Sequence, residues 1–364
     1  MIKNLDLWLK SYWQQEIKRL KSKKHEVRPV HIMFCLVDHF EPDWGGADFK
    51  AQMWRVQQWV DRYPRLAREH VDADDVCPAH SFFYPAEVYN EAHMYQLEKL
   101  CRAGLAEVNI HLHHDRDDEQ GLRQKLSKAK DDFLRHGFLG KDKEMEGIRY
   151  AFIHGNWALN NSRSDGRWCG VNNESNILND TGCYADFTLP SAPSSTQTSM
   201  INSLYYDEGN EARPKSHDGG TKVKVGGEAL KQLMIIQGPL TLNWRRRKFG
   251  IIPRIENSDI CSTNPPTDGR INLWVKQNIS VLNKPDWAFV KVHTHGAQEK
   301  NMSVLLGDSL DSMFSHLETN YNDGENFVLH YVTAREMYNI IKAAEAGKNG
   351  NPGLYRDFLI EKNM

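Results

Sequence analysis

The sequence predicts an α/β fold, a deformed (β/α) barrel of about seven or eight parallel strands with a long loop insertion over the rim where the strands end. Three observations lead to this prediction. Short apolar runs of strand length, such as residues 30–37, alternate with longer segments in which apolar residues recur every three or four positions. Such alternation is typical of parallel strands joined by crossover helices. The length of 364 residues suits one barrel with insertions.

The individual elements follow from these two periodicities. Strands are expected over 30–37, 80–87, 107–115, 148–154, 287–296 and 327–332, with a further short apolar run at 233–236. Helices are expected over 49–70, about 94–105, 121–136, 271–281, 310–321 and 334–346. Gly347 is a natural end for the last of these helices.

The chain is expected to form one catalytic domain, residues 30–364, preceded by an amphipathic helix within residues 1–29 that packs on the barrel. From about 158 to 228 the alternation of strands and helices stops, and Asn, Ser, Gly, Asp and Pro dominate. An irregular span of this length inside a compact domain is usually a functional insertion. We therefore expect loops over the site.

Composition excludes several classes of protein. Lys and Arg number 46 against 48 Asp and Glu, so a net charge of -2 gives no indication of nucleic acid as a partner. The six cysteines show no C-x-x-C spacing, which argues against a zinc knuckle and against a disulfide framework. No apolar stretch has the length of a transmembrane segment, and the first residues do not resemble a secretory leader. The expected location is the cytoplasm.

Histidines and aspartates gather where three of the predicted strands end. The first strand delivers Asp38 and His39, the third contains Glu107-Val-Asn-Ile-His-Leu-His-His-Asp115, and a late strand contains His293 and His295. Alternation along the third strand puts His111, His113 and Asp115 on one side and His114 on the other, where we expect it to be structural. Carboxyl ends of parallel strands converge on one rim, and imidazole with carboxylate is a common ligand set for divalent metals.

These motifs resemble the polysaccharide deacetylases, metal-dependent hydrolases on a deformed (β/α) barrel within the glycoside hydrolase/deacetylase superfamily. Asp38-His39 stands where that family has a first-strand Asp-Asp pair, and His111 with Asp115 stands where its third strand has two histidines. Phe82-Phe83 is similar to its second-strand pair. The family's Arg-containing motif after the fourth strand is absent, and His154-Gly-Asn-Trp157 takes its place, as in a divergent branch.

The resemblance implies a role for each of these side chains. Asp38 would be the general base, with His39, His111 and Asp115 as ligands of one divalent ion, most simply Zn²⁺. His113 could replace Asp115, Asp38 could be the ligand in place of His39, and either His293 or His295 would be the general acid. Five further residues are candidates for contact with substrate: Glu87, His154, Asn156, Trp157 and Asp186.

The expected function is that of a metal-dependent hydrolase that removes N- or O-linked acetyl groups from a polysaccharide, an oligosaccharide or a glycan precursor. Two alternatives stay open. Histidine pairs at strand ends also occur in metal-dependent amidohydrolase and phosphoesterase barrels, although there the pair usually closes the first strand. The chain could also be a catalytically degenerate barrel that binds carbohydrate.

Overall fold

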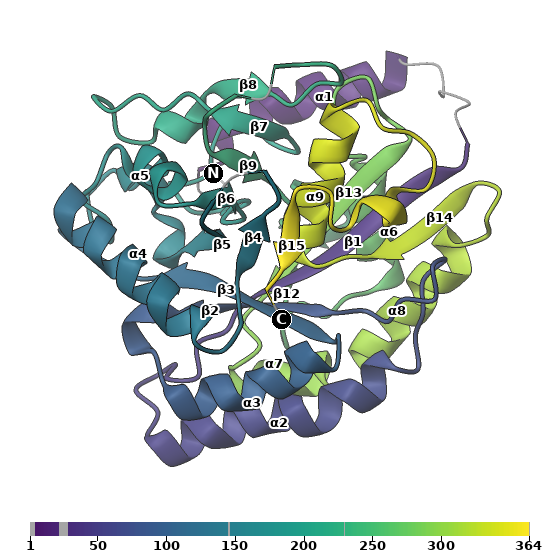
Figure 1. Ribbon diagram of the computed structural model, residues 1–364. Coiled ribbons are helices and arrows are strands. Elements are labelled where there is room, and N and C mark those ends of the chain that lie inside the picture. The colour runs from purple at the N-terminus through teal and green to yellow at the C-terminus, as the bar shows by residue number, and fades with distance from the viewer. Residues whose placement is uncertain (1–3, 22–27, 145, 229, 364) are drawn as a thin grey trace.

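A large, mostly parallel sheet organises the part of the chain that the computed structural model describes, which is residues 4–21, 28–144, 146–228 and 230–363. Its strands follow one another in space in the order β12-β13-β1-β2-β3-β5-β6-β9-β7-β8 (Figure 1). The strands on this path are β1 (Val30–His39), β2 (His80–Pro85), β3 (Ala106–Leu112), β5 (Ile148–His154), β6 (Cys183–Asp186), β7 (Leu204–Asp207), β8 (Gly220–Lys222), β9 (Met234–Ile236), β12 (Asp259–Ile260) and β13 (Trp287–Thr294).

Strand β1 is the centre of the sheet. It pairs in parallel with β13 from His31 to Asp38 along one side. Along its other side it pairs first with β14 (Phe327–Tyr331) and then with β2, also in parallel. Its apolar run is buried on both faces, as a strand inside a parallel sheet requires. The carboxyl ends of β1, β2, β3 and β13 therefore meet at one edge.

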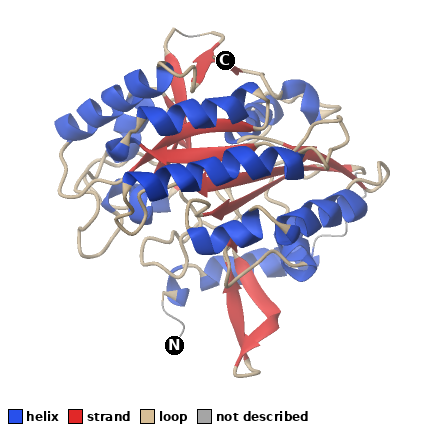
Figure 2. Ribbon diagram, turned by 90° about the horizontal axis from the view of Figure 1, so that it is seen from below, coloured by secondary structure: helices blue, strands red, loops and turns tan. Residues whose placement is uncertain are grey.

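Helices lie along the outside of this sheet (Figures 1 and 2). The helices are α1 (Leu9–Lys21), α2 (Phe49–Ala67), α3 (Glu91–Arg102), α4 (Glu119–Leu134), α5 (Glu174–Asp180), α6 (Asp268–Lys276), α7 (Glu299–Leu305), α8 (Asp308–Tyr321) and α9 (Ala334–Glu345). Side-chain hydrogen bonds cap the N-termini of two of these helices. The Asp48 side chain accepts a hydrogen bond from the Ala51 amide at the start of α2, and Thr333 with Glu336 forms a capping box on α9.

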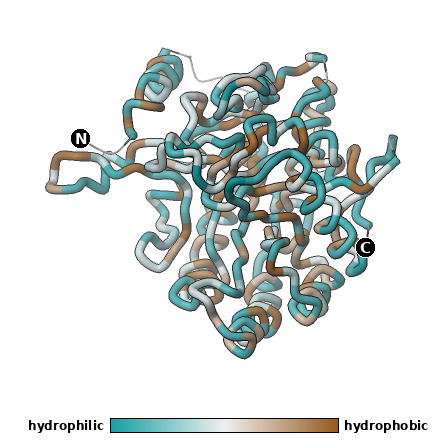
Figure 3. Tube along the Cα trace, turned by 90° about the vertical axis from the view of Figure 1, so that its left-hand side faces the viewer, coloured by the Kyte–Doolittle hydropathy of each residue, from teal (hydrophilic) through white to brown (hydrophobic). Residues whose placement is uncertain are grey.

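Alternation along β1 divides its side chains between two apolar cores. Phe34 and Leu36 pack with Trp59 of α2 in one core, whereas Cys35 and Val37 belong to the other. Hydrophobic stretches run along the strands through the interior of the molecule (Figure 3). The same alternation sends Asp38 and His39 to opposite faces of β1, which decides their different surroundings.

The expected α/β class with a mostly parallel sheet is confirmed, but the strands that the structure describes pair along an open path and not as a closed ring. Part of the 158–228 span also joins the sheet, since β6, β7 and β8 lie there. These strands have three or four residues each, which is too short for a periodicity to show in the sequence. That span is therefore more than loops.

Two smaller features complete the fold. Trp8, just before helix α1, and Tyr12 of α1 pack in a separate apolar cluster with Ile201 and Leu240. Residues 1–3 and 22–27 of the expected N-terminal segment lie outside the described residues. An unpredicted antiparallel hairpin, β10 (Thr241–Lys248) with β11 (Ile252–Glu256), projects from the body (Figure 2). Within the described ranges, no helix combines the length and apolar character needed to cross a membrane.

Candidate metal centre

Three histidine rings from separate strand ends meet at the carboxyl edge of the sheet. The His39 ring, at the end of β1, stacks on the ring of His295, just after β13, with 4.7 Å between ring centroids. The same ring meets His111 of β3 edge-on at 5.1 Å. Parallel pairing of β1 with β13, and of β2 with both β1 and β3, brings these distant residues together. Convergence of these three histidines is what the sequence led us to expect.

A fourth member of the group, Glu41, was not predicted from the sequence. Its Oε1 lies 3.2 Å from Nε2 of His111 and 3.4 Å from Nε2 of His113. Its carboxylate shares one possible ligand set with His39 and His295, and a second with His111 and His113, with donor atoms in each set within 4.8 Å of one another. The available signal was its spacing, since Glu41 follows His39 by two residues directly after the strand.

The orientation of His111 leaves one nitrogen free for a metal. Its Nδ1 lies 2.8 Å from the carbonyl oxygen of Ile153, so Nδ1 carries the hydrogen and donates it. Its Nε2 then presents a lone pair toward Glu41. An imidazole fixed in this way by a backbone carbonyl is the common arrangement for metal-ligating histidines. The ring is fully buried, so it cannot swing into solvent.

His113 lies at the margin of the group and is held by two carboxylates. Its Nδ1 is 2.6 Å from Oε1 of Glu87, so the predicted substrate residue Glu87 contacts a histidine instead. Although burial lowers the pKa of His113, its bonds to Glu41 and Glu87 raise it to about 10. A Cβ on Gly155 would lie 2.3 Å from the His113 ring, so only glycine permits this approach.

Burial and the neighbouring histidines keep the His39 imidazole neutral, which is the form that binds metals. Burial, and then the neighbouring His295 and His111, lower the pKa of His39 well below its ordinary value. Burial raises the pKa of Glu41, but its interactions with the His111 and His113 side chains outweigh burial and bring that pKa below its ordinary range. The centre therefore combines a neutral imidazole with an ionised carboxylate.

Asp38, the expected general base, lies outside this group. It is fully buried on the opposite face of β1, where Oδ2 is 2.9 Å from Nε2 of His80 and Oδ1 accepts a hydrogen bond of 2.6 Å from the Gly296 amide. A Cβ on Gly296 would lie 2.1 Å from Oδ2, so a glycine is needed there. Asp38 therefore holds the backbone next to His295, and both of its oxygens are engaged.

Asp115, the expected third ligand, also lies elsewhere. It is exposed, and its Oδ1 accepts a hydrogen bond of 2.5 Å from the Trp168 amide. The strand ends at Leu112, so the alternation that the sequence suggested does not extend as far as Asp115. Glu41 supplies the carboxylate beside His111 instead.

An open cavity of about 480 Å³ borders the centre. His293, His295 and Trp157 line one part of it, and the Nδ1 of His293 and the indole Nε1 of Trp157 have no hydrogen-bond partner among the described residues. Burial, and then the charge of Lys291, lower the pKa of His293 well below its ordinary value. The remaining lining is rich in hydroxyl and amide side chains, including Ser191, Ser194, Asn257, Ser262, Thr263, Gln298 and Asn301.

Two other expected substrate residues are buried behind the centre. His154 lies in a separate group of metal-ligating side chains with His114. Asp186 accepts hydrogen bonds from the amide and the hydroxyl of Thr188, at 3.0 and 2.7 Å, and burial raises its pKa to about 7. Asn156 lies next to Trp157, and both have left-handed backbone angles, with φ of 55° and 56°. Of the five residues, Trp157 is the one that lines the cavity.

The donor set of the centre fits a divalent transition metal. In open catalytic sites, Zn²⁺ and similar ions are bound by imidazole nitrogens together with one carboxylate oxygen. Two ligand sets that share Glu41 could hold such an ion, one with His39 and His295 and one with His111 and His113. The edge-on contact between the His39 and His111 rings joins the two sets. Comparison with protein-family models and with curated protein sequences finds no match to this chain.

Proposed function

We propose that the protein is a metal-dependent hydrolase that acts on carbohydrate and removes acetyl groups. The observation that carries this proposal is the meeting of His39, His111, His295 and Glu41 at the carboxyl ends of parallel strands, beside an open cavity. Active sites of β/α folds lie at this edge. Under this proposal, the fold is a variant of the deformed barrel of the polysaccharide deacetylases.

The residues around the centre would have different roles in hydrolysis. A divalent ion, when bound, lowers the pKa of a water ligand and polarises the carbonyl of an acetyl group. His39, His111, His295 and Glu41 would hold it. His293 lines the cavity, where its imidazole would exchange a proton with the leaving group.

The cavity supports a sugar as the substrate. Serine, threonine, asparagine and glutamine side chains of the lining can exchange hydrogen bonds with sugar hydroxyl groups. Trp157 offers a flat apolar ring, whose centroid lies 6.1 Å from that of His39. Lys300 is one cation on the wall. This mixture suits a neutral or weakly acidic glycan better than an apolar ligand.

The test is acetate release from a panel of N- and O-acetylated oligosaccharides by the zinc-loaded protein. The wild type should release acetate, a chelator should stop the reaction, and added Zn²⁺ should restore it. His111→Ala should be inactive, whereas His316→Ala, a histidine variant on α8, should retain the activity of the wild type.

Two results would overturn the proposal. A metal-loaded protein that releases no acetate from any acetylated sugar, but binds one of them, would favour a carbohydrate-binding barrel. Release of phosphate from a simple phosphate ester, without release of acetate, would favour a phosphoesterase.

A further inference from the structure

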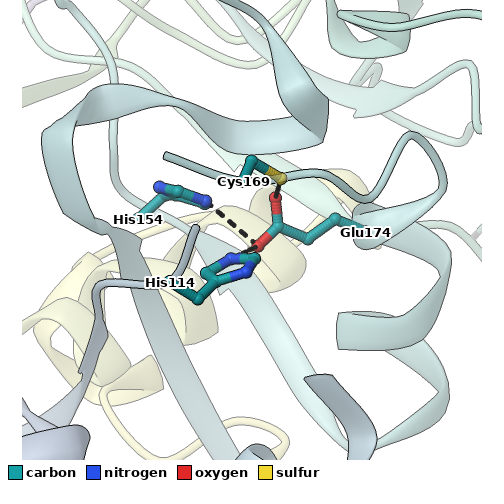
Figure 4. A group of neighbouring side chains, drawn as sticks. All are labelled: His114, His154, Cys169 and Glu174. Atoms are coloured by element: carbon teal, nitrogen blue, oxygen red, sulfur yellow. Dashed lines mark hydrogen bonds and ion pairs between the residues drawn. The ribbon is translucent and has the colours of Figure 1, made fainter. Parts of the chain in front are cut away.

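A second group of metal-ligating side chains shares no residue with the first. His114 follows β3, His154 ends β5, Cys169 lies in the loop before α5, and Glu174 begins α5. Figure 4 shows these four side chains pointing toward a common centre. His114 is 7 % exposed, and the other three are fully buried. We propose that these four side chains bind a Zn²⁺ ion in a closed, structural site.

The separations between the donor atoms fit a tetrahedral ion. Oε1 of Glu174 lies 3.0 Å from Nε2 of His114 and 3.3 Å from Nε2 of His154, and its Oε2 lies 3.4 Å from Sγ of Cys169. All four donor atoms can be chosen within 4.8 Å of one another. Ligands about 2.0–2.3 Å from a tetrahedral zinc stand roughly 3.3–3.7 Å apart. Little movement is therefore needed to close the four groups around an ion.

Counting hydrogens places two lone pairs opposite each other between His154 and Glu174. Nδ1 of His154 lies 2.5 Å from the carbonyl oxygen of Gly155, so this nitrogen carries the hydrogen of the neutral ring. Nε2 then presents a lone pair to Oε1 of Glu174 and has no hydrogen-bond partner among the described residues. Two lone pairs facing each other in a buried place repel. A cation between them would be bound by both lone pairs, and the repulsion would be removed.

Partners behind the four side chains hold them in the ligating form. Nδ1 of His114 lies within ion-pair distance of Asp117, 3.2 Å from its Oδ2, while Nε2 faces Oε1 of Glu174 at 3.0 Å. The backbone amides of Asn161 and Val171 donate to Sγ of Cys169 at 3.3 and 3.4 Å. The Asn160 amide donates to Oε2 of Glu174 at 2.8 Å. Outer contacts of this kind are usual around bound metals.

The donor set identifies both the metal and its role. One thiolate, two imidazoles and one carboxylate form a borderline-soft set that favours Zn²⁺ over Mg²⁺ or Ca²⁺. Four protein ligands complete the coordination of zinc and leave no position for water or substrate. Because the group is buried, it has no access for a substrate. A structural ion is the use that remains.

Such an ion would fix the wall of the candidate metal centre. It would join the ends of β3 and β5 to the loop that leads into α5. Between His154 and that loop lies Trp157, whose ring centroid is 6.1 Å from those of both His39 and His295. Trp157 has a left-handed φ of 56°, a strained conformation for a tryptophan that its surroundings must enforce. Zinc at His154 would supply that restraint.

The test combines elemental analysis with zinc K-edge X-ray absorption on the full chain, after incubation with Zn²⁺ and removal of the excess. The wild type should hold zinc with one sulfur ligand at about 2.3 Å. Cys169→Ser should lose this sulfur contribution and about one zinc per chain. Cys183→Ser, which replaces another buried cysteine outside the group, should keep both. His111→Ala should lose the other metal and keep the sulfur-bound zinc.

Wild-type protein without a sulfur-bound zinc would overturn the inference, because the four side chains would then be only a hydrogen-bonded cluster. So would equal zinc content in Cys169→Ser and Cys183→Ser. If Cys169→Ser does not fold, the wild-type spectrum decides alone. A sulfur-bound zinc in a protein that releases no acetate would support this inference and contradict only the proposed hydrolase.

Discussion

The two histidine groups of this protein differ in what surrounds them. The candidate metal centre of His39, Glu41, His111 and His295 borders an open cavity, and its carboxylate is shared between histidines. The group of His114, His154, Cys169 and Glu174 is buried and includes a sulfur atom. The first arrangement leaves room for a substrate, whereas the second is closed.

The end of strand β3 supplies one histidine to each of the two groups. His111 and His114 lie three residues apart at the end of β3, yet they belong to different groups. His111 faces the convergence of β1 and β13, while His114 faces α5. A dense run of histidines is therefore divided by geometry into a candidate reaction site and a candidate structural site.

The largest expected effect comes from His111→Ala. Loss of a ligand at the open centre should lower kcat/KM for acetate release by about 1000-fold or more, because a metal supplies several kcal/mol of transition-state stabilisation. Thermal unfolding should change little by comparison with activity, since the closed group remains intact. A His111→Ala protein that keeps its activity would remove the open centre from the reaction.

The next effect is on stability and separates the closed group from the open one. Cys169→Ser should lower the free energy of unfolding by about 3–5 kcal/mol, because it removes a metal and leaves the buried charge of Glu174 poorly compensated. Cys183→Ser should cost about 1–3 kcal/mol, the usual cost of a buried hydroxyl with an imperfect partner. Denaturant unfolding of both variants measures the difference. Equal losses would show that Cys169 has no special role.

The smallest effect is expected from Asp38→Asn. Asp38 bonds both His80 and the Gly296 amide, and an amide side chain cannot accept both hydrogen bonds. Displacement of His295 should lower activity by about 10–100-fold, the usual effect of a residue that orients a ligand. The pH–rate profile should keep its shape. A larger fall with loss of the acidic limb would show that Asp38 is the general base.

The sequence predicts the parts of this fold that have long periodic patterns. The apolar run at 30–37 and the helical pattern at 49–70 correspond to β1 and α2. The hairpin of β10 and β11 has no such signal, since Trp244-Arg-Arg-Arg-Lys248 resembles a solvated charged run. The short strands β6 to β8 depend on pairing with distant segments, which no local pattern encodes.

Prediction of the candidate sites meets a similar limit. His39, His111 and His295 could be brought together by the rule that parallel strands end at one edge. Glu41 had only the weaker signal of its place two residues after His39, because it lies beyond the strand, where alternation no longer tells which way a side chain points. Cys169 and Glu174 come from a loop and a short helix inside the irregular span, so only the folded chain places them beside His114 and His154.

The most direct test of two distinct centres is an anomalous difference map from crystals of the zinc-loaded protein, recorded just above the zinc edge. We predict two peaks, one between His39, Glu41, His111 and His295, and one between His114, His154, Cys169 and Glu174. A map with a peak at only one group, or at neither, would contradict the account.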